Sequence, residues 1–129
     1  MRPIFNLHAV LLASLIASAS FVAMAAGDHQ HSAKFGGVVV QTKAGDVEIV
    51  AKTDSIRIYF TDHGKPAKLD GATAKVTLLN GAEKSEVELT ATGDQLEAKG
   101  AFKVTKGTKG IAVLILAGKP PVTARFDIK

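Results

Sequence analysis

Polar and apolar residues alternate in several short segments of this chain, and this pattern constrains the fold more than any other feature of the sequence. The segments are 47–49, 56–60, 75–78, 87–89 and 123–128, and residues 37–41 are a further strand candidate that follows a Gly-Gly pair. Because successive side chains of a β-strand point to opposite faces, each segment predicts a strand with one face on a core. Residues 111–116 are apolar throughout, which favours a strand covered on both faces. Five charged residues that alternate with apolar neighbours are expected to face solvent: Glu48, Arg57, Glu88, Glu97 and Arg125.

Turn-forming residues separate these segments. Glycine, often beside Asn, Asp or Pro, occurs at 44–46, 63–66, 70–71, 80–81, 93–94, 106–107 and 118–121. Glycine and Asn tolerate positive φ, and Pro cannot continue a central strand ladder. Short strands at this spacing predict an all-β fold, a single antiparallel immunoglobulin-like β-sandwich of about seven strands. The chain has no Cys and no Trp, so the expected similarity to antibody domains is one of architecture only.

The first 25 residues have the layout of a secretory signal peptide. Arg2 supplies a positive charge, residues 9–22 are apolar, and Ala23 and Ala25 are the small residues of an A-x-A cleavage site. The apolar run of about 14 residues is shorter than the roughly 20 that span a bilayer. We therefore expect residues 1–25 to be cleaved, with export to the periplasm and no membrane insertion of the mature chain.

After cleavage, the chain divides into a short arm and one domain. Residues 26–34 are small and polar, which predicts a flexible arm, and residues 35–129 are long enough for a single core. Loss of Arg2 leaves 15 cations and 12 acids, a net charge of +3. The lysines are scattered among acids, whereas a nucleic-acid site needs clustered cations and stacking aromatics. We therefore expect no nucleic-acid partner.

Two histidines lie in the predicted arm, within the run Asp28-His29-Gln30-His31. Imidazole and carboxylate ligands without sulfur suit Cu(II), Ni(II), Zn or Co(II) and do not favour Cu(I). An extended arm would place the two rings about 7 Å apart on one side, so the arm must bend to bring both to one ion. In the simpler interpretation, these histidines only solubilise the arm.

The cleavage position decides what His29 can do. Cleavage after Ala26 leaves Gly27 at the N-terminus, and its amine, two amide nitrogens and the His29 ring can then enclose Cu(II) or Ni(II) in a square plane. Cleavage after Ala25 makes His29 the fourth residue and removes this chelate. Small residues are preferred at position −3, where Ala23 favours cleavage after Ala25.

Asp62 and His63 form the adjacent acid–histidine pair of the predicted domain, within the turn-like stretch 61–66. Neighbouring residues at the end of a strand point in opposite directions, which argues against a catalytic dyad. The sequence contains no nucleophile elbow, H-E-x-x-H motif or phosphate-binding loop. We therefore predict that the protein is not an enzyme, and that Asp62 and His63 are either turn residues or additional metal ligands.

Several short motifs of the chain resemble those of a known family. They occupy 36–39, 47–52, 58–66, 71–81, 117–120 and 124–126. Together they resemble small exported proteins found with heavy-metal efflux systems, and they are similar to a β-rich domain in the periplasmic adaptor subunits of RND-type pumps. The family often carries a histidine directly before the Gly-Gly pair, where this chain has Phe35, whereas Asp62-His63-Gly64 matches. The resemblance implies periplasmic metal handling or resistance, with copper, cobalt, zinc or cadmium as the metal.

These patterns together predict a non-enzymatic periplasmic accessory protein that binds divalent transition metals and acts with components of a metal efflux or resistance system. The expected mechanism is capture by His29 and His31, with Asp28, Asp62 and His63 as further ligands when the arm folds back. The alternative, from a different class of function, is a structural or interaction module without metal. Such a module would dock on an envelope or efflux complex through an exposed strand edge.

Overall fold

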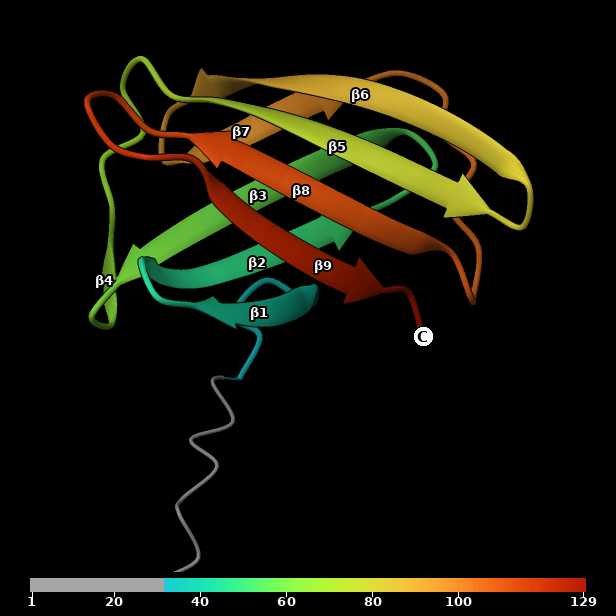
Figure 1. Cartoon of the computed structure of the whole chain (residues 1–129), viewed down its shortest axis with the longest axis horizontal. Coiled ribbons are helices and arrows are strands. Elements are labelled where there is room, and N and C mark those ends of the chain that lie inside the picture. The colour runs from blue at the N-terminus through green and yellow to red at the C-terminus, as the bar shows by residue number, and fades with distance from the viewer. Residues whose placement is uncertain (1–31) are drawn as a thin grey trace, which may run out of the picture.

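Nine β-strands make up residues 32–129, the part of the chain that the computed structural model describes (Figure 1). They are β1 Val38–Thr42, β2 Gly45–Ala51, β3 Ser55–Asp62, β4 Lys65–Pro66, β5 Thr73–Asn80, β6 Glu83–Thr92, β7 Gln95–Lys99, β8 Lys109–Ile115 and β9 Val122–Asp127. The all-β prediction is confirmed. The predicted signal peptide and most of the predicted arm lie outside the described residues. No helix able to cross a lipid bilayer occurs within residues 32–129.

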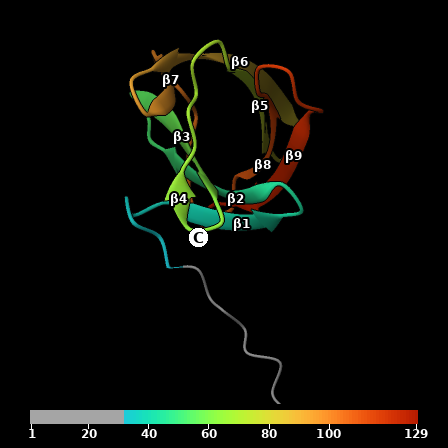
Figure 2. The same ribbon diagram turned by 90° about the vertical axis from the view of Figure 1, so that its left-hand side faces the viewer.

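All nine strands belong to one antiparallel sheet. Its order is β1-β2-β3-β7-β6-β5-β8-β9, and β4 pairs with the end of β3. The sheet curls until its first and last strands, β1 and β9, lie side by side, which gives it a nearly barrel-like shape (Figure 2). No strand ladder joins β1 to β9 within the described sheet, so the curled sheet has an open seam.

This architecture differs from the predicted immunoglobulin-like sandwich of about seven strands. A sandwich needs two separate stacked sheets, whereas here continuous ladders join β1 through to β9 in a single sheet, with the pairing of β3 and β7 connecting its two halves. The alternation of the sequence does not separate the two cases, because sandwiches and curled sheets both bury every second residue. The two strands absent from the prediction are β4, which has only two residues, and β7.

A cross-strand ion pair supports the contact between β3 and β7. Arg57 and Glu97 are opposite each other in the ladder, and Arg57 Nε donates to Glu97 Oε2 at 2.7 Å. The Glu97 hydrogen bond and charge raise the pKa of Arg57. The Glu97 side chain is only 11% exposed. The expectation that Glu97 is a solvated residue is therefore wrong, because Arg57 and the strand pairing cover it.

The inward faces of the strands enclose one apolar core. Its fully buried members include Val47, Ile49, Ile56, Ile58, Val76, Leu78, Leu89, Leu96 and Leu114. Strand β9 shows the predicted alternation, with Val122, Ala124 and Phe126 buried and the residues between them exposed. Strand β8 turns only one face to the core, so Ile115 is 52% exposed. The expectation that this strand is covered on both faces is therefore wrong.

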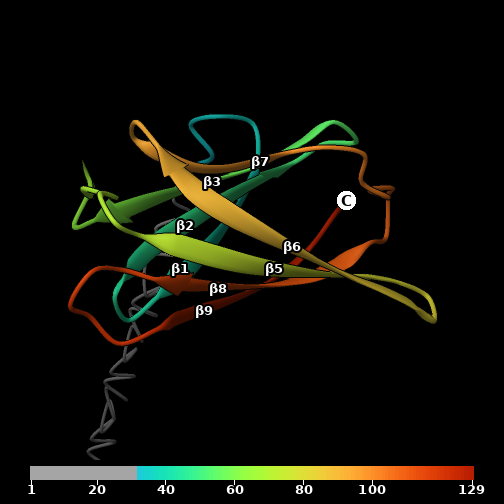
Figure 3. The ribbon, with the colours of Figure 1, turned by 90° about the horizontal axis from the view of Figure 1, so that it is seen from above.

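The β5–β6 hairpin extends beyond the rest of the curled sheet (Figure 3). Residues 83–86 at the start of β6 are all exposed, and the side chains there carry charges of both signs. Lys103 Nζ reaches Glu83 Oε1 at 2.7 Å, and Lys75 Nζ lies 3.4 Å from Glu86 Oε2. This part of the molecule therefore presents a mixed, solvated surface.

Candidate functional site

The β3–β4 hairpin turns at His63 and Gly64. Asp62 at the end of β3 pairs with Lys65 at the start of β4, so only two residues connect the strands. Their φ angles are 48° at His63 and 79° at Gly64. Two consecutive positive φ angles are typical of a type I′ turn, whose twist matches that of a hairpin. Among residues 32–129, His63 is the one non-glycine residue with positive φ. Histidine is one of the few residue types enriched in this conformation.

The turn brings the side chains of Asp62 and His63 together, and we call these two residues the acid–histidine pair. His63 Nδ1 is hydrogen-bonded to Asp62 Oδ1. In neutral His63, Nδ1–H donates to the carboxylate and Nε2 keeps its lone pair, the arrangement common in metal-binding histidines. The His63 side chain is 95% exposed. The expectation that the two side chains point apart is wrong, because the turn backbone ends the alternation of the strand.

Glu48 of β2 fixes the segment through which the N-terminal part of the chain joins the domain. Its carboxylate accepts backbone N–H groups from Lys34 at 2.9 Å, Phe35 at 2.8 Å and Gly37 at 3.1 Å. Glu48 is only 7% exposed. The expectation that Glu48 faces solvent is wrong, because residues 34–37, which we call the anchored segment, cover the outer face of β2.

Phe35 and Gly37 hold the anchored segment against the sheet. The Phe35 ring stacks on Tyr59, with ring centroids 3.7 Å apart and an angle of 11° between the planes. A Cβ at position 37 would overlap the Ile49 backbone and lie 2.9 Å from Val50 Cγ2, so the close approach requires glycine. Phe35, directly before the Gly36-Gly37 pair, thus contributes an aromatic contact.

The anchored segment begins beside the acid–histidine pair. A cavity of about 160 Å³ is lined by Ser32 and Lys34 on one side and by Thr61 and Gly64, the residues that flank the pair, on the other, whereas Asp62 and His63 themselves do not line it. His31 directly precedes Ser32 in the sequence, and consecutive Cα atoms are 3.8 Å apart. The fold therefore brings the attachment point of one predicted ligand close to the turn that carries another, His63.

The acid–histidine pair is at most part of a metal site. Within residues 32–129, no group of three or more His, Cys, Asp or Glu side chains is placed to hold a metal ion. The other candidate ligands, Asp28, His29 and His31, lie outside the described residues. A protein-bound ion at His63 would therefore need further ligands from the arm or from solvent.

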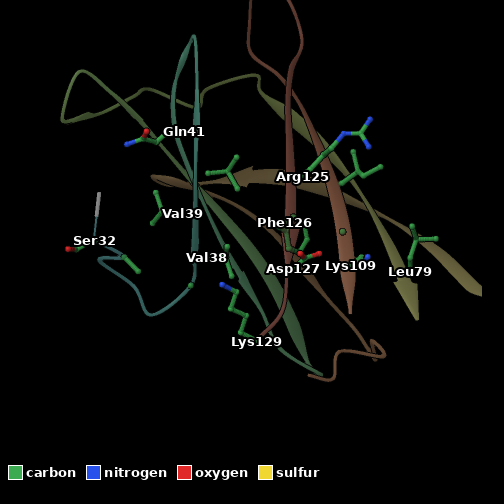
Figure 4. Close-up of a pocket in the computed structure, with 15 residues that line it drawn as sticks. Ser32, Val38, Val39, Gln41, Leu79, Lys109, Arg125, Phe126, Asp127 and Lys129 are labelled. Atoms are coloured by element: carbon green, nitrogen blue, oxygen red, sulfur yellow. The ribbon is translucent and has the colours of Figure 1, made fainter. Parts of the chain in front are cut away.

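A larger groove of about 880 Å³ runs along the seam between β1 and β9 (Figure 4). Arg125, Asp127 and Lys129 lie around it with apolar side chains of both strands. Asp62 and His63 do not line this groove. The described part of the chain thus carries two separate surface features, the acid–histidine pair on a hairpin turn and the groove at the seam.

Fold and site together define a small all-β domain with a single curled sheet and an exposed acid–histidine pair. Comparisons of the chain with protein-family models, with curated proteins and with solved structures find no match. The function of this chain is therefore inferred from the geometry of the described residues and from the sequence patterns.

Proposed function

We propose that this protein binds divalent transition-metal ions through His63 and the histidines of the predicted arm. The observation that carries the proposal is the placement of the anchored segment, which starts beside the turn that exposes His63. His31 is one residue from Ser32, so its ring reaches the neighbourhood of His63 when the arm folds back. Imidazole and carboxylate ligands suit Cu(II), Ni(II), Zn and Co(II).

Asp62 has a supporting role in this proposal. A carboxylate that accepts Nδ1–H fixes the orientation of the imidazole and leaves Nε2 as the metal ligand. His63 would then bind the ion, Asp62 would orient His63, and His29, His31 and Asp28 would supply ligands from the arm.

We further propose that residues 1–25 are a signal peptide and that the mature protein works in the periplasm. The signal-peptide layout of the first 25 residues supports export, and the resemblance to proteins of heavy-metal efflux systems supports a role in metal resistance. In such a system, the protein would capture copper or another divalent metal reversibly and pass it to periplasmic efflux components, without catalysing a reaction.

Asp62→Asn is expected to weaken metal binding by the mature protein roughly 10- to 100-fold, the usual effect of removing a carboxylate that orients a ligating histidine. The measurement is calorimetric titration of residues 26–129 with Cu(II), Zn, Co(II) and Ni(II) in turn. Asp70→Asn is the matched control, because Asp70 is an exposed acid at a different turn. An Asp62→Asn affinity equal to that of the control would contradict the role given to Asp62.

His63→Asn removes the imidazole while keeping a residue type that tolerates positive φ, so the hairpin turn should be retained. We expect at least a tenfold loss of metal affinity, and a comparable loss in the double variant His29→Ala/His31→Ala. Circular dichroism and thermal unfolding verify that the domain is intact. If the wild-type protein binds none of the four metals at micromolar concentration, the metal-binding proposal is wrong.

A further inference from the structure

The groove at the seam runs along the edge of β1 (Figure 4). Residues 37–41 line one wall consecutively, and they include the half-buried valines 38–40. At about 3.3 Å per residue, this wall spans roughly 13 Å. Some Cα atoms of β1 and β9 lie within 8 Å of each other, whereas a strand inserted between two others needs a separation of roughly 9–10 Å. The groove therefore suits a flexible ligand that is narrower than a peptide strand.

The opposite wall of the groove combines apolar and cationic side chains on the outer face of the sheet. Ile111 of β8 and Arg125 of β9 are opposite each other in the ladder, and both alternate with buried residues, so both point outward. Lys109 of β8 and Leu79 of β5 are also opposite each other and lie on the same outer face. Because these side chains share one face, an apolar surface lies directly beside the cations.

Cations predominate among the charged residues of the groove. Lys109, Arg125 and Lys129 line it together with a single acid, Asp127. None of the three cations takes part in an ion pair with another residue in 32–129. The groove therefore attracts an anionic group, and the planar guanidinium of Arg125 can donate two parallel hydrogen bonds to a carboxylate.

We propose that the groove binds a free medium-chain fatty acid, with its carboxylate at Arg125 and its acyl chain between the valines of β1 and Ile111. The other two cations add positive charge around the carboxylate. The groove volume of about 880 Å³ lies within the range of ligand pockets, which are roughly 300–1,000 Å³ and mostly apolar, with a few polar groups that orient the ligand. The proposal does not rest on metal binding, since Asp62 and His63 do not line the groove.

Two other occupants fit the groove less well. A second copy of this chain would place cations against cations where the two grooves meet, and like charges facing each other across an interface disfavour association. An anionic membrane would offer headgroups to the exposed cations and leave the apolar walls uncovered, because its acyl chains stay within the bilayer. A free fatty acid satisfies the cations and the apolar walls together.

Calorimetric titration of the mature protein with monomeric dodecanoate tests the proposal. We expect saturable binding that is about tenfold or more tighter than that of octanoate, because each fully buried methylene contributes up to about fourfold. Arg125→Gln should weaken binding about tenfold or more, since it removes the charged donor. Lys68→Gln makes the same change in charge at an exposed lysine outside the groove, and it should leave the affinity unchanged. Dodecyltrimethylammonium, which has the same apolar chain and a cationic head, should not bind.

Ile111→Glu tests the apolar wall, because it places a competing carboxylate beside Arg125 and should abolish dodecanoate binding. Ile115→Glu is the matched control, since it makes the same change on the same face of β8 at a residue that is 52% exposed and outside the groove. Circular dichroism verifies that both variants fold, and if Ile111→Glu does not, the Arg125→Gln result decides. In the wild type, dodecanoate should change the amide chemical shifts of residues 38–40 and 111.

Three results would overturn the proposal. The first is equal affinity of the Arg125→Gln variant and wild type for dodecanoate, or chemical-shift changes confined to residues outside the groove. The second is co-sedimentation of the protein with anionic phospholipid vesicles without binding of free dodecanoate, which would make the ligand a lipid surface. The third is dimerisation through the seam that excludes dodecanoate, which would make the occupant a second copy of the chain.

Discussion

Replacing Gly110 with valine is expected to destabilise the domain by about 3 kcal/mol, because the inner face of β8 has no space for a side chain at this position. Gly110 is opposite Phe126 in the β8–β9 ladder, and a Cβ at position 110 would overlap the Phe126 ring. Phe126 is only 5% exposed, so its ring cannot move aside without losing contact with the core. Urea unfolding followed by circular dichroism measures the change in the free energy of unfolding.

A double-mutant cycle tests whether the Phe126 ring causes the loss of stability in Gly110→Val. Phe126→Leu creates space beside position 110, so Gly110→Val should cost less in that background than in wild type. We expect a favourable coupling energy of about 1 kcal/mol or more between the two substitutions. If Gly110→Val alone changes the free energy of unfolding by less than about 0.5 kcal/mol, the packing of Phe126 over Gly110 is not as described.

The local part of the fold could be predicted from the sequence. Alternation of polar and apolar residues can be read from a few consecutive positions, because it reflects which face of a strand is buried. Segments such as 56–60 and 123–128 are therefore predictable as strands. The pairing of β3 with β7 brings together residues such as Arg57 and Glu97, forty positions apart in the chain. No local pattern records that contact. Alternation therefore predicted the strands and left the choice between one curled sheet and two stacked sheets undetermined.

In the candidate site too, local features could be predicted from the sequence and contacts between distant residues could not. Glu48 lies between the apolar residues Val47 and Ile49, a pattern that is equally typical of a residue facing solvent. It is buried because the anchored segment covers it and donates backbone N–H groups to its carboxylate. The Gly36-Gly37 pair was the available signal, since paired glycines permit close backbone approach, and Gly37 does approach β2 closely. For the acid–histidine pair, the glycine and proline within 63–66 indicated a turn, but not that this turn brings the side chains of Asp62 and His63 together.

Glu48→Ala is expected to lower the free energy of unfolding by about 3 kcal/mol, because it removes the acceptor of three backbone N–H groups. Loss of the carboxylate should also release the anchored segment, including the stacking of Phe35 on Tyr59. Urea unfolding gives the stability change, and faster hydrogen exchange at the Phe35 and Gly37 amides reports the release. The control is Glu88→Ala, which makes the same change at an exposed strand position and should alter stability by less than about 0.5 kcal/mol.

The Glu48→Ala variant also connects the fold to the proposed metal site. Under native conditions, the domain should remain folded while Ser32 is no longer held beside the turn that carries His63. Metal affinity should then fall, because bringing arm ligands to His63 costs more conformational entropy when their attachment point is free. Calorimetric titration of Glu48→Ala beside Glu88→Ala measures this loss. If Glu48→Ala releases the anchored segment and still binds metal as tightly as Glu88→Ala, then the placement of the segment does not contribute to the site.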